Sequence, residues 1–205
     1  GACLTIAFCF IFSHRMLAAS GDVDPTFSTA AFSLLNSGIA VTVVQPDGKY
    51  IVGGNFTVAG GKARYGLARL NTDGSLDTSF DPPDFYDPTV SFNSLGGTIY
   101  TVALQSNGKV IVGGRFEITG SPYRSIVRLN ANGSIDTSFN NVSVNGFINE
   151  IRRITVLADD TIVIGGNFQI GNETGSTSQV AKLDANGNFN PAFRMINFGG
   201  TLRDF

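Results

Sequence analysis

The stretch Gln45-Pro-Asp-Gly-Lys-Tyr-Ile-Val-Gly-Gly-Asn-Phe56 decides the fold, because it returns twice further along the chain. The second copy is Gln105-Ser-Asn-Gly-Lys-Val-Ile-Val-Gly-Gly-Arg-Phe116, and the third is Leu157-Ala-Asp-Asp-Thr-Ile-Val-Ile-Gly-Gly-Asn-Phe168. A second block follows each copy and ends in phenylalanine, at residues 67–80, 126–139 and 180–193. Self-similarity at a period of some tens of residues is the signature of a repeat architecture.

Each repeat predicts four short antiparallel strands separated by tight turns. In the first repeat, Asp47-Gly48 and Asp73-Gly74 each lie between two apolar runs, which is typical of two-residue type I′ hairpin turns. The Gly53-Gly54 pair lies inside a strand, where glycine marks a bulge or a close backbone approach. No stretch of the repeats shows sustained helical periodicity. The expected strands of the first repeat are residues 39–45, 50–57, 67–71 and 76–80.

Four antiparallel strands per repeat predict an all-β fold built from β-propeller blades. Propellers close with about 4 to 8 blades, so about three blades predict an incomplete propeller, a fragment with unpaired edges and exposed apolar faces. We divide the chain into an apolar leader (1–20) and a repeat domain (21–205). The repeat domain consists of a partial closing strand (21–30), repeat one (38–82), repeat two (97–141), repeat three (148–195) and the start of repeat four (199–205).

The two blocks together resemble a known family. The pattern Gln-Pro-Asp-Gly-Lys-x-Ile-Val-Gly-Gly-x-Phe from Gln45, followed by Arg-Leu-Asn-x-x-Gly-Ser-Leu-Asp-x-Ser-Phe from Arg69, is similar to the delta-60 repeat of bacterial secreted and surface proteins. This resemblance implies a β-propeller fold and an exported protein, and brings no established activity with it. A weaker similarity to kelch repeats rests on the Gly-Gly pairs. The third repeat departs from the pattern at Asp159-Asp160-Thr161, where we expect a strained or different turn.

The first residues predict export. The apolar run Ala2–Phe12 is too short to span a bilayer and has the length of the hydrophobic core of a signal peptide. Ala18-Ala19-Ser20 offers small residues for cleavage before Gly21, so we expect a secreted or cell-surface protein. An N-terminal anchor and a true start at Met16 are the alternatives. Both cysteines, Cys3 and Cys9, lie in this run.

Composition excludes several classes. A hydrophobic content of 42% is too high for intrinsic disorder, and a net charge of -2 argues against a nucleic-acid partner. The repeat domain contains no apolar run long enough to span a membrane. His14 is the single histidine and lies in the leader, so the domain lacks the parts of a Ser-His-Asp triad or a His metal site. We expect no cofactor.

Several residue types recur at fixed positions, and we interpret them as structural. A cation and an acid repeated once per blade predict a pair between strands or blades, with a ring of ligand-binding charges as the alternative. The recurring phenylalanines predict core packing between sheets, with a stacking surface for sugar rings as the alternative. These positions are Gly53, Gly54, Gly113, Gly114, Gly165 and Gly166; Phe56, Phe116, Phe168, Phe80, Phe139 and Phe193; Arg69, Arg128 and Lys182; and Asp77 and Asp136.

Two other chemistries stay open from the sequence. The loops at 71–77, 130–136 and 184–190 have the oxygen-rich spacing of a calcium loop, although a hairpin turn followed by a capping Asp explains them as well. Pairing of carboxylates among Asp84, Asp87, Asp159 and Asp160 across blades would suit a glycosidase.

The sequence therefore favours an exported, non-enzymatic propeller module that contacts protein or glycan at a cell surface. The alternatives are a secreted polysaccharide hydrolase or lyase that uses loop aspartates, and an architectural segment of a larger repetitive surface protein. Ligand and partner are left unassigned.

Overall fold

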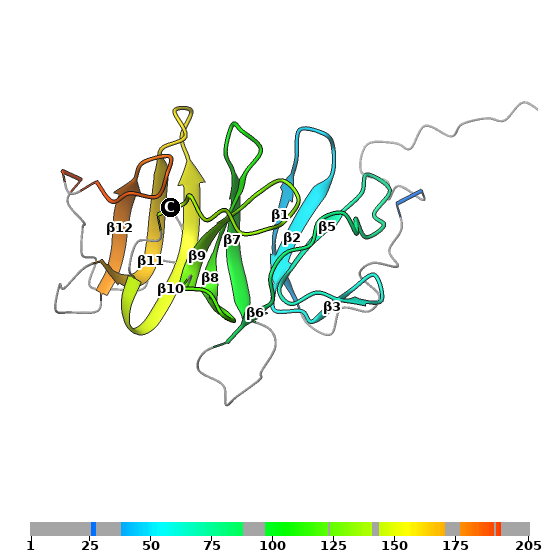
Figure 1. The fold of residues 1–205 in the computed structure, drawn as a ribbon, viewed down its shortest axis with the longest axis horizontal. Coiled ribbons are helices and arrows are strands. Elements are labelled where there is room, and N and C mark those ends of the chain that lie inside the picture. Colours follow the sequence, from blue (N-terminus) through cyan, green and yellow to red (C-terminus); the bar gives the residue numbers. More distant parts are fainter. Residues whose placement is uncertain are drawn as a thin grey trace, which may run out of the picture.

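A computed structural model describes residues 26–27, 38–87, 97–122, 124–140, 144–170, 177–190 and 192–193. The regular structure of these residues is β-strand throughout (Figure 1). The predicted leader, most of the partial closing strand and the start of repeat four lie outside the described residues.

Each repeat forms one antiparallel sheet, which we call blade 1, blade 2 and blade 3. Blade 1 has the strand order β1 (Ile39–Val44), β2 (Tyr50–Gly54), β5 (Leu67–Leu70). Blade 2 has β7 (Thr98–Leu104), β8 (Val110–Ile118), β9 (Arg124–Leu129), with β6 (Phe85–Tyr86) also paired to β8. Blade 3 has β10 (Val144–Val156), β11 (Ile162–Ile170), β12 (Thr177–Leu183). A small hairpin of β3 (Val58–Ala59) and β4 (Lys62–Ala63) follows β2.

The fourth segment of each blade pairs through a single bridge. Leu76, Ile135 and Phe189 form isolated bridges to Leu70, Leu129 and Leu183. In blade 1 the chain turns away directly afterwards, because the Asp77 carboxylate accepts a hydrogen bond from Ser79 N at 2.9 Å and the Asp77 carbonyl accepts one from Phe80 N. The predicted four-segment unit is present, with its fourth segment shortened by this turn.

The hairpin turn at Asp47-Gly48 is not the predicted type I′. Gly48 has a positive φ of 82°, while Asp47 does not. The hydrogen bonds run from Gly48 N to Gln45 O and from Gln45 N to Lys49 O. This is a three-residue loop, a type I turn closed by a glycine bulge. Two consecutive residues with positive φ occur instead at Gly60-Gly61, between β3 and β4.

The third repeat keeps the same turn without the glycine. Asp160 N donates to Leu157 O at 2.9 Å, as Gly48 and Gly108 do in their turns, and Asp160 has a φ of 60°. A non-glycine residue in this region is strained, so the expected strain is present and the turn type is unchanged.

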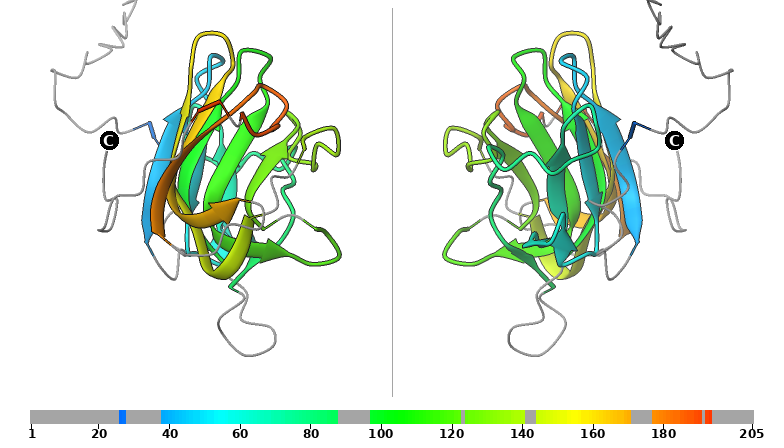
Figure 2. Two further views of the ribbon diagram at one scale, coloured as in Figure 1. Left: turned by 90° about the vertical axis from the view of Figure 1, so that its left-hand side faces the viewer. Right: turned by 90° about the vertical axis from the view of Figure 1, so that its right-hand side faces the viewer.

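The three sheets lie face to face in chain order, as Figures 1 and 2 show. The first strand of each later blade makes the contact: β7 packs against β1 and β2, and β10 packs against β7, β8 and β9. One hydrophobic core runs through all three blades and contains Ile51, Ile99, Ile111 and Ile154. We call the face of a blade that points to the next blade its leading face, and the opposite face its trailing face.

Candidate functional site

The second glycine of each Gly-Gly pair allows a bulge in the first strand. A Cβ added to Gly54, Gly114 or Gly166 would lie 2.1–2.2 Å from a backbone carbonyl oxygen in the first strand or directly before it. The register slips by one residue at this point in every blade, between Ile39 and Val41, Ile99 and Thr101, and Ile151 and Arg153. The glycine is therefore required where the bulged strand crosses close above it.

The first glycine of the pair allows close packing of blades. A Cβ on Gly53 would lie 2.7 Å from Ile99 Cγ2 of blade 2, and a Cβ on Gly113 would lie 2.7 Å from Ile154 Cδ1 of blade 3. Gly165 occupies the same position in β11. The two glycines of one motif thus serve two purposes, one within the sheet and one between sheets.

The recurring cation and acid form a buried ion pair on the leading face. In blade 1, Arg69 Nε lies 2.8 Å from Asp77 Oδ2, and Lys49 Nζ lies 2.8 Å from the same oxygen. In blade 2, Arg128 Nε and Lys109 Nζ lie 2.7 and 2.6 Å from Asp136 Oδ2. We call each set of two cations and one acid a junction cluster.

Each junction cluster reaches the next blade through its arginine. Arg69 Nη1 donates to the carbonyl of Ala131 in blade 2 at 2.7 Å, and Arg128 Nη1 donates to the carbonyl of Ala185 in blade 3 at 2.6 Å. A backbone hydrogen bond runs beside each of them, from Asp81 N to Asn132 O and from Asn140 N to Asn186 O. The arginines therefore connect successive blades.

The closing phenylalanines complete these junctions. The Arg69 guanidinium lies 4.8 Å from the ring centroid of Phe80, and the Arg128 guanidinium lies 4.9 Å from that of Phe139, both within cation–π range. Phe80 and Phe139 are buried, whereas Phe193 of the third repeat is half-buried. The other recurring phenylalanines, Phe56, Phe116 and Phe168, are buried.

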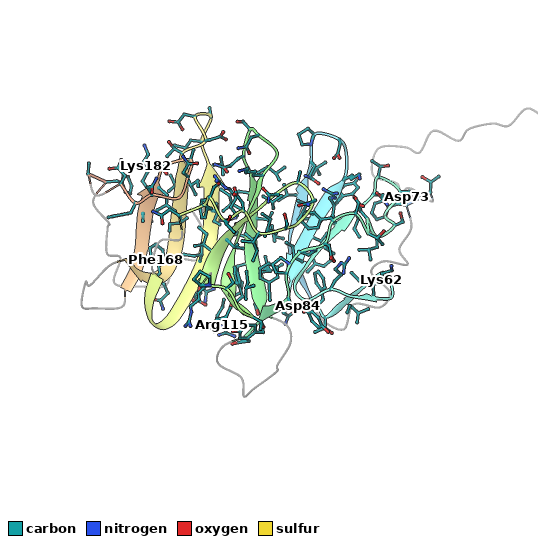
Figure 3. All side chains as sticks on the ribbon, viewed as in Figure 1. Lys62, Asp73, Asp84, Arg115, Phe168 and Lys182 are labelled. Carbon is teal, nitrogen blue, oxygen red and sulfur yellow. The ribbon has the colours of Figure 1, made fainter. Side chains whose placement is uncertain are left out.

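Blade 3 has no such cluster in the part of the chain that is described. Lys182, Thr161 and Asn190 replace the arginine, the lysine and the acid, and Lys182 is half-buried near the upper end of the sheet in Figure 3. The backbone bond from Asn190 N to Lys182 O at 2.9 Å is kept. Blade 3 therefore keeps the backbone hydrogen bond of the other two blades but has fewer charged side chains at these positions.

The junction carboxylates are held ionised. Burial alone would raise the pKa of Asp77, but hydrogen bonds from Lys49, Ser79 and Arg69 outweigh it and hold the pKa well below its usual range. Burial opposes ionisation of Asp136 too, and the hydrogen bonds from Lys109 and Ser138 together with the charge of Arg128 lower its pKa in the same way.

This arrangement predicts a loss of stability in acid. As the pH falls, these aspartates take up protons in the unfolded chain first, near the ordinary aspartate pKa of about 3.9, because their pKa values are depressed in the folded chain. The junction carboxylates therefore stabilise the fold fully above about pH 5, and this contribution is lost as the pH falls below about 4. We expect Asp136→Asn to show a smaller drop in unfolding free energy between pH 7 and pH 3 than the unaltered chain, measured by urea denaturation.

The matched control is Asp81→Asn, because the Asp81 side chain is exposed. Between pH 7 and pH 3, the unfolding free energy of this variant should fall by as much as that of the unaltered chain. If both variants reduced the pH dependence of the unfolding free energy equally, the loss of stability in acid could not be assigned to the junction carboxylate.

The candidate carboxylates for hydrolysis do not come together. Asp159 and Asp160 lie in the turn between β10 and β11, while Asp84 and Asp87 flank β6 at the other end of the sheets (Figures 1 and 3). Asp87 pairs with Arg115 at 2.9 Å, and both Asp160 oxygens accept hydrogen bonds from Ser106 of blade 2. These bonds to Ser106 lower the pKa of Asp160.

In the oxygen-rich loops, aspartate oxygens accept hydrogen bonds from residues of the same loop. Asp73 Oδ1 accepts from both the backbone N and the Oγ of Ser75, and in the third loop Asp184 accepts from Asn186 and Asn188. Asp77 faces its two cations. Among the described residues, no group of three or more His, Cys, Asp or Glu side chains could hold a metal ion.

The bulge in the first strand of each blade contains one unpaired residue, which the sequence pattern did not single out. The unpaired residues of the bulges are Ala40, Tyr100 and Arg152, on strands that lie at the edge of their sheets. The Arg152 guanidinium lies 5.4 Å from the Tyr100 ring centroid, and Arg152 Nη2 lies 2.7 Å from Glu150 Oε1. We call these the bulge positions. Their signal in the sequence is a variable residue at a fixed distance before an invariant Gly-Gly pair.

Stacked antiparallel sheets, each built from the same repeated strands and Gly-Gly bulge, define a β-propeller repeat protein. The family model described as a domain of unknown function (DUF5122) beta-propeller matches residues 45–80, 105–139 and 157–193, which together make up more than half of the chain. The chain belongs to this DUF5122 beta-propeller family. Each of the three matched segments lies within one of the predicted repeats, and the described sheets do not close into a ring. No curated protein matches the chain. The described residues include no helix that could span a membrane.

Proposed function

We propose that the chain is an exported, non-enzymatic β-propeller module of the delta-60 type, which binds a protein or glycan at a cell surface through its bulge positions. The observation that carries the proposal is that recurring and variable positions of the repeat have different surroundings. The recurring residues, such as Arg128 and Asp136, contact other parts of the blades, whereas the bulge positions differ from blade to blade.

The chemistry of the bulge positions supports a binding role. Bulges re-aim a side chain away from the sheet ladder, and Tyr and Arg are enriched among residues that dominate binding energies. Tyr100 offers an aromatic face, and Arg152 beside it is a cation whose side chain is 38% exposed. The three edge strands lie next to one another, so the bulge positions form one row.

Export is supported by the sequence of the leader. An apolar run of signal-peptide length is followed by small residues suited to cleavage before Gly21. Expression with a tag at residue 205 and recovery of a product that begins at Gly21 outside the cytoplasm would support export. Retention of an uncleaved chain in the cytoplasm would contradict it.

Binding is tested with a double variant. Tyr100→Ala with Arg152→Ala should lower the affinity for any glycan or surface protein captured by the unaltered chain at least tenfold, measured on a glycan array and by calorimetry. The control is Asn107→Asp, in a turn remote from the row, which should leave affinity unchanged. Unchanged binding by the double variant, or turnover of a polysaccharide by the unaltered chain, would contradict the proposal.

A further inference from the structure

Three hairpin turns contain the dipeptide Asn-Gly, in which the asparagine side chain readily loses ammonia. In this reaction the glycine backbone nitrogen attacks the asparagine Cγ, and glycine favours it because no side chain hinders the attack. The peptide between the two residues must rotate to bring these atoms together, so the folded turn has to open locally first. The three turns contain Asn107-Gly108, Asn132-Gly133 and Asn186-Gly187.

The peptide that must rotate is held at both ends in two of these turns. The Asn132 carbonyl accepts a hydrogen bond from Asp81 N at 2.9 Å, and the Asn186 carbonyl accepts one from Asn140 N at 2.8 Å. The glycine N–H at the other end of each peptide donates across its own turn. Rotation at either site therefore breaks a hydrogen bond between blades as well as one within the turn.

Packing around the glycines adds a second restraint in the same two turns. Gly133 and Gly187 are both buried. A Cβ added to Gly133 would lie 2.8 Å from the backbone of Asp81, and a Cβ added to Gly187 would lie 2.7 Å from the Phe139 ring. Neither glycine therefore has free space beside it on that side.

The turn with Asn107 lacks both restraints. Gly108 N donates to Gln105 O at 3.0 Å, but no described residue donates to the Asn107 carbonyl. A Cβ added to Gly108 would meet no atom within 4 Å. Ser106 N donates to Asp160 of the next blade, and this bond holds the peptide between Gln105 and Ser106, which is not the one that must rotate.

We infer that Asn107 is a site of spontaneous covalent modification, at which the folded chain deamidates in preference to Asn132 and Asn186. The Gly108 nitrogen loses its proton and bonds to the Asn107 Cγ, the Cγ–Nδ2 bond breaks, and ammonia leaves a succinimide ring. Water then hydrolyses one of the two ring carbonyls, which gives aspartate or isoaspartate at position 107.

The turn accepts the aspartate product. Asp47 occupies the same place in blade 1, where its Oδ1 accepts a hydrogen bond from Lys49 N at 3.1 Å. Asn107 Oδ1 accepts the matching bond from Lys109 N at 3.0 Å. The isoaspartate product instead lengthens the backbone of the turn by one carbon, so it should lower the melting temperature where aspartate leaves it unchanged.

The experiment incubates the complete folded chain in mildly alkaline buffer, which helps the glycine nitrogen to lose its proton, and follows each Asn-Gly peptide by mass spectrometry. Asn107 should deamidate at least about tenfold faster than Asn132 or Asn186, because opening those turns breaks one more hydrogen bond and moves a packed glycine. Asn145-Gly146 lies in β10 rather than in a turn and is followed as a separate peptide.

The control for intrinsic reactivity is the same chain unfolded in urea, where the three rates should become similar because glycine follows each asparagine. The Asn107→Asp variant identifies the aspartate product and should leave the rates at Asn132 and Asn186 unchanged. Deamidation of Asn132 or Asn186 as fast as that of Asn107 in the folded chain would overturn the inference. So would the same preference for Asn107 in urea, or an intact Asn107 in the folded chain after the unfolded chain has reacted completely.

Discussion

Gly114→Ala is expected to lower the free energy of unfolding by about 3 kcal/mol, the upper part of the range for overpacked sites. The added Cβ would lie 2.1 Å from the Thr98 carbonyl oxygen and 3.0 Å from Ile99 Cα, and neither atom belongs to a flexible side chain. Relief requires the bulged strand to move, and β7 is packed between blade 1 and β10. Urea denaturation at pH 7 measures the effect.

Gly108→Ala is the matched control for this variant. Gly108 has a φ of 78°, but an added Cβ meets nothing within 4 Å. Its substitution should lower stability by about 1 kcal/mol, the penalty of placing a side chain in the left-handed region. If Gly114→Ala proved no more destabilising than Gly108→Ala, the explanation of the Gly-Gly pair would be wrong.

Arg128→Ala should lower the free energy of unfolding by about 3–5 kcal/mol, because it breaks a buried ion pair by removing one partner. The Arg128 side chain is 2% exposed and donates to Asp136, to Gln105 Oε1 and to Ala185 O of the next blade. Its loss leaves Asp136 with Lys109 as the remaining cation of the cluster and removes a bond between blades 2 and 3.

Lys182→Ala provides the comparison at the same repeat position. Lys182 is half-buried, and Asn190 stands where the other repeats have aspartate, so its loss should lower stability by less than about 1 kcal/mol. Both are measured by urea denaturation of otherwise identical chains. Equal losses would show that the junction cluster adds nothing beyond the packing of a long side chain.

The sequence was sufficient for the fold class because the informative residues recur. A single Gly-Gly pair is ambiguous, but three pairs at one register, each before a phenylalanine, require three similar backbones. Recurrence also predicted that Arg69 and Asp77 form a pair, since a cation and an acid in one register of short strands come close. The family match to the same three segments agrees with this interpretation.

The contacts between blades could not be predicted because one partner is backbone. Arg69 and Arg128 donate to alanine carbonyls, and an alanine carries no sequence signal for this role. The turn at Asp47-Gly48 was assigned wrongly because Asp-Gly suits both a type I′ turn and a type I turn with a glycine bulge. Asp160 pairs with Ser106 at the contact between blades 2 and 3. At the contact between blades 1 and 2, the equivalent positions are held by Gly108 and Pro46. The pair therefore does not recur, and the repeat pattern could not predict it.

The most direct test of stacked, equivalent blades is a nuclear Overhauser measurement between methyl groups and glycine Hα atoms. Packing of each Gly-Gly pair against the next blade predicts cross-peaks from Gly53 Hα to the Ile99 Cγ2 methyl and from Gly113 Hα to the Ile154 Cδ1 methyl. Both peaks should be among the strongest contacts between residues far apart in the sequence. Absence of both peaks, with the two glycine pairs in unlike surroundings, would contradict the account.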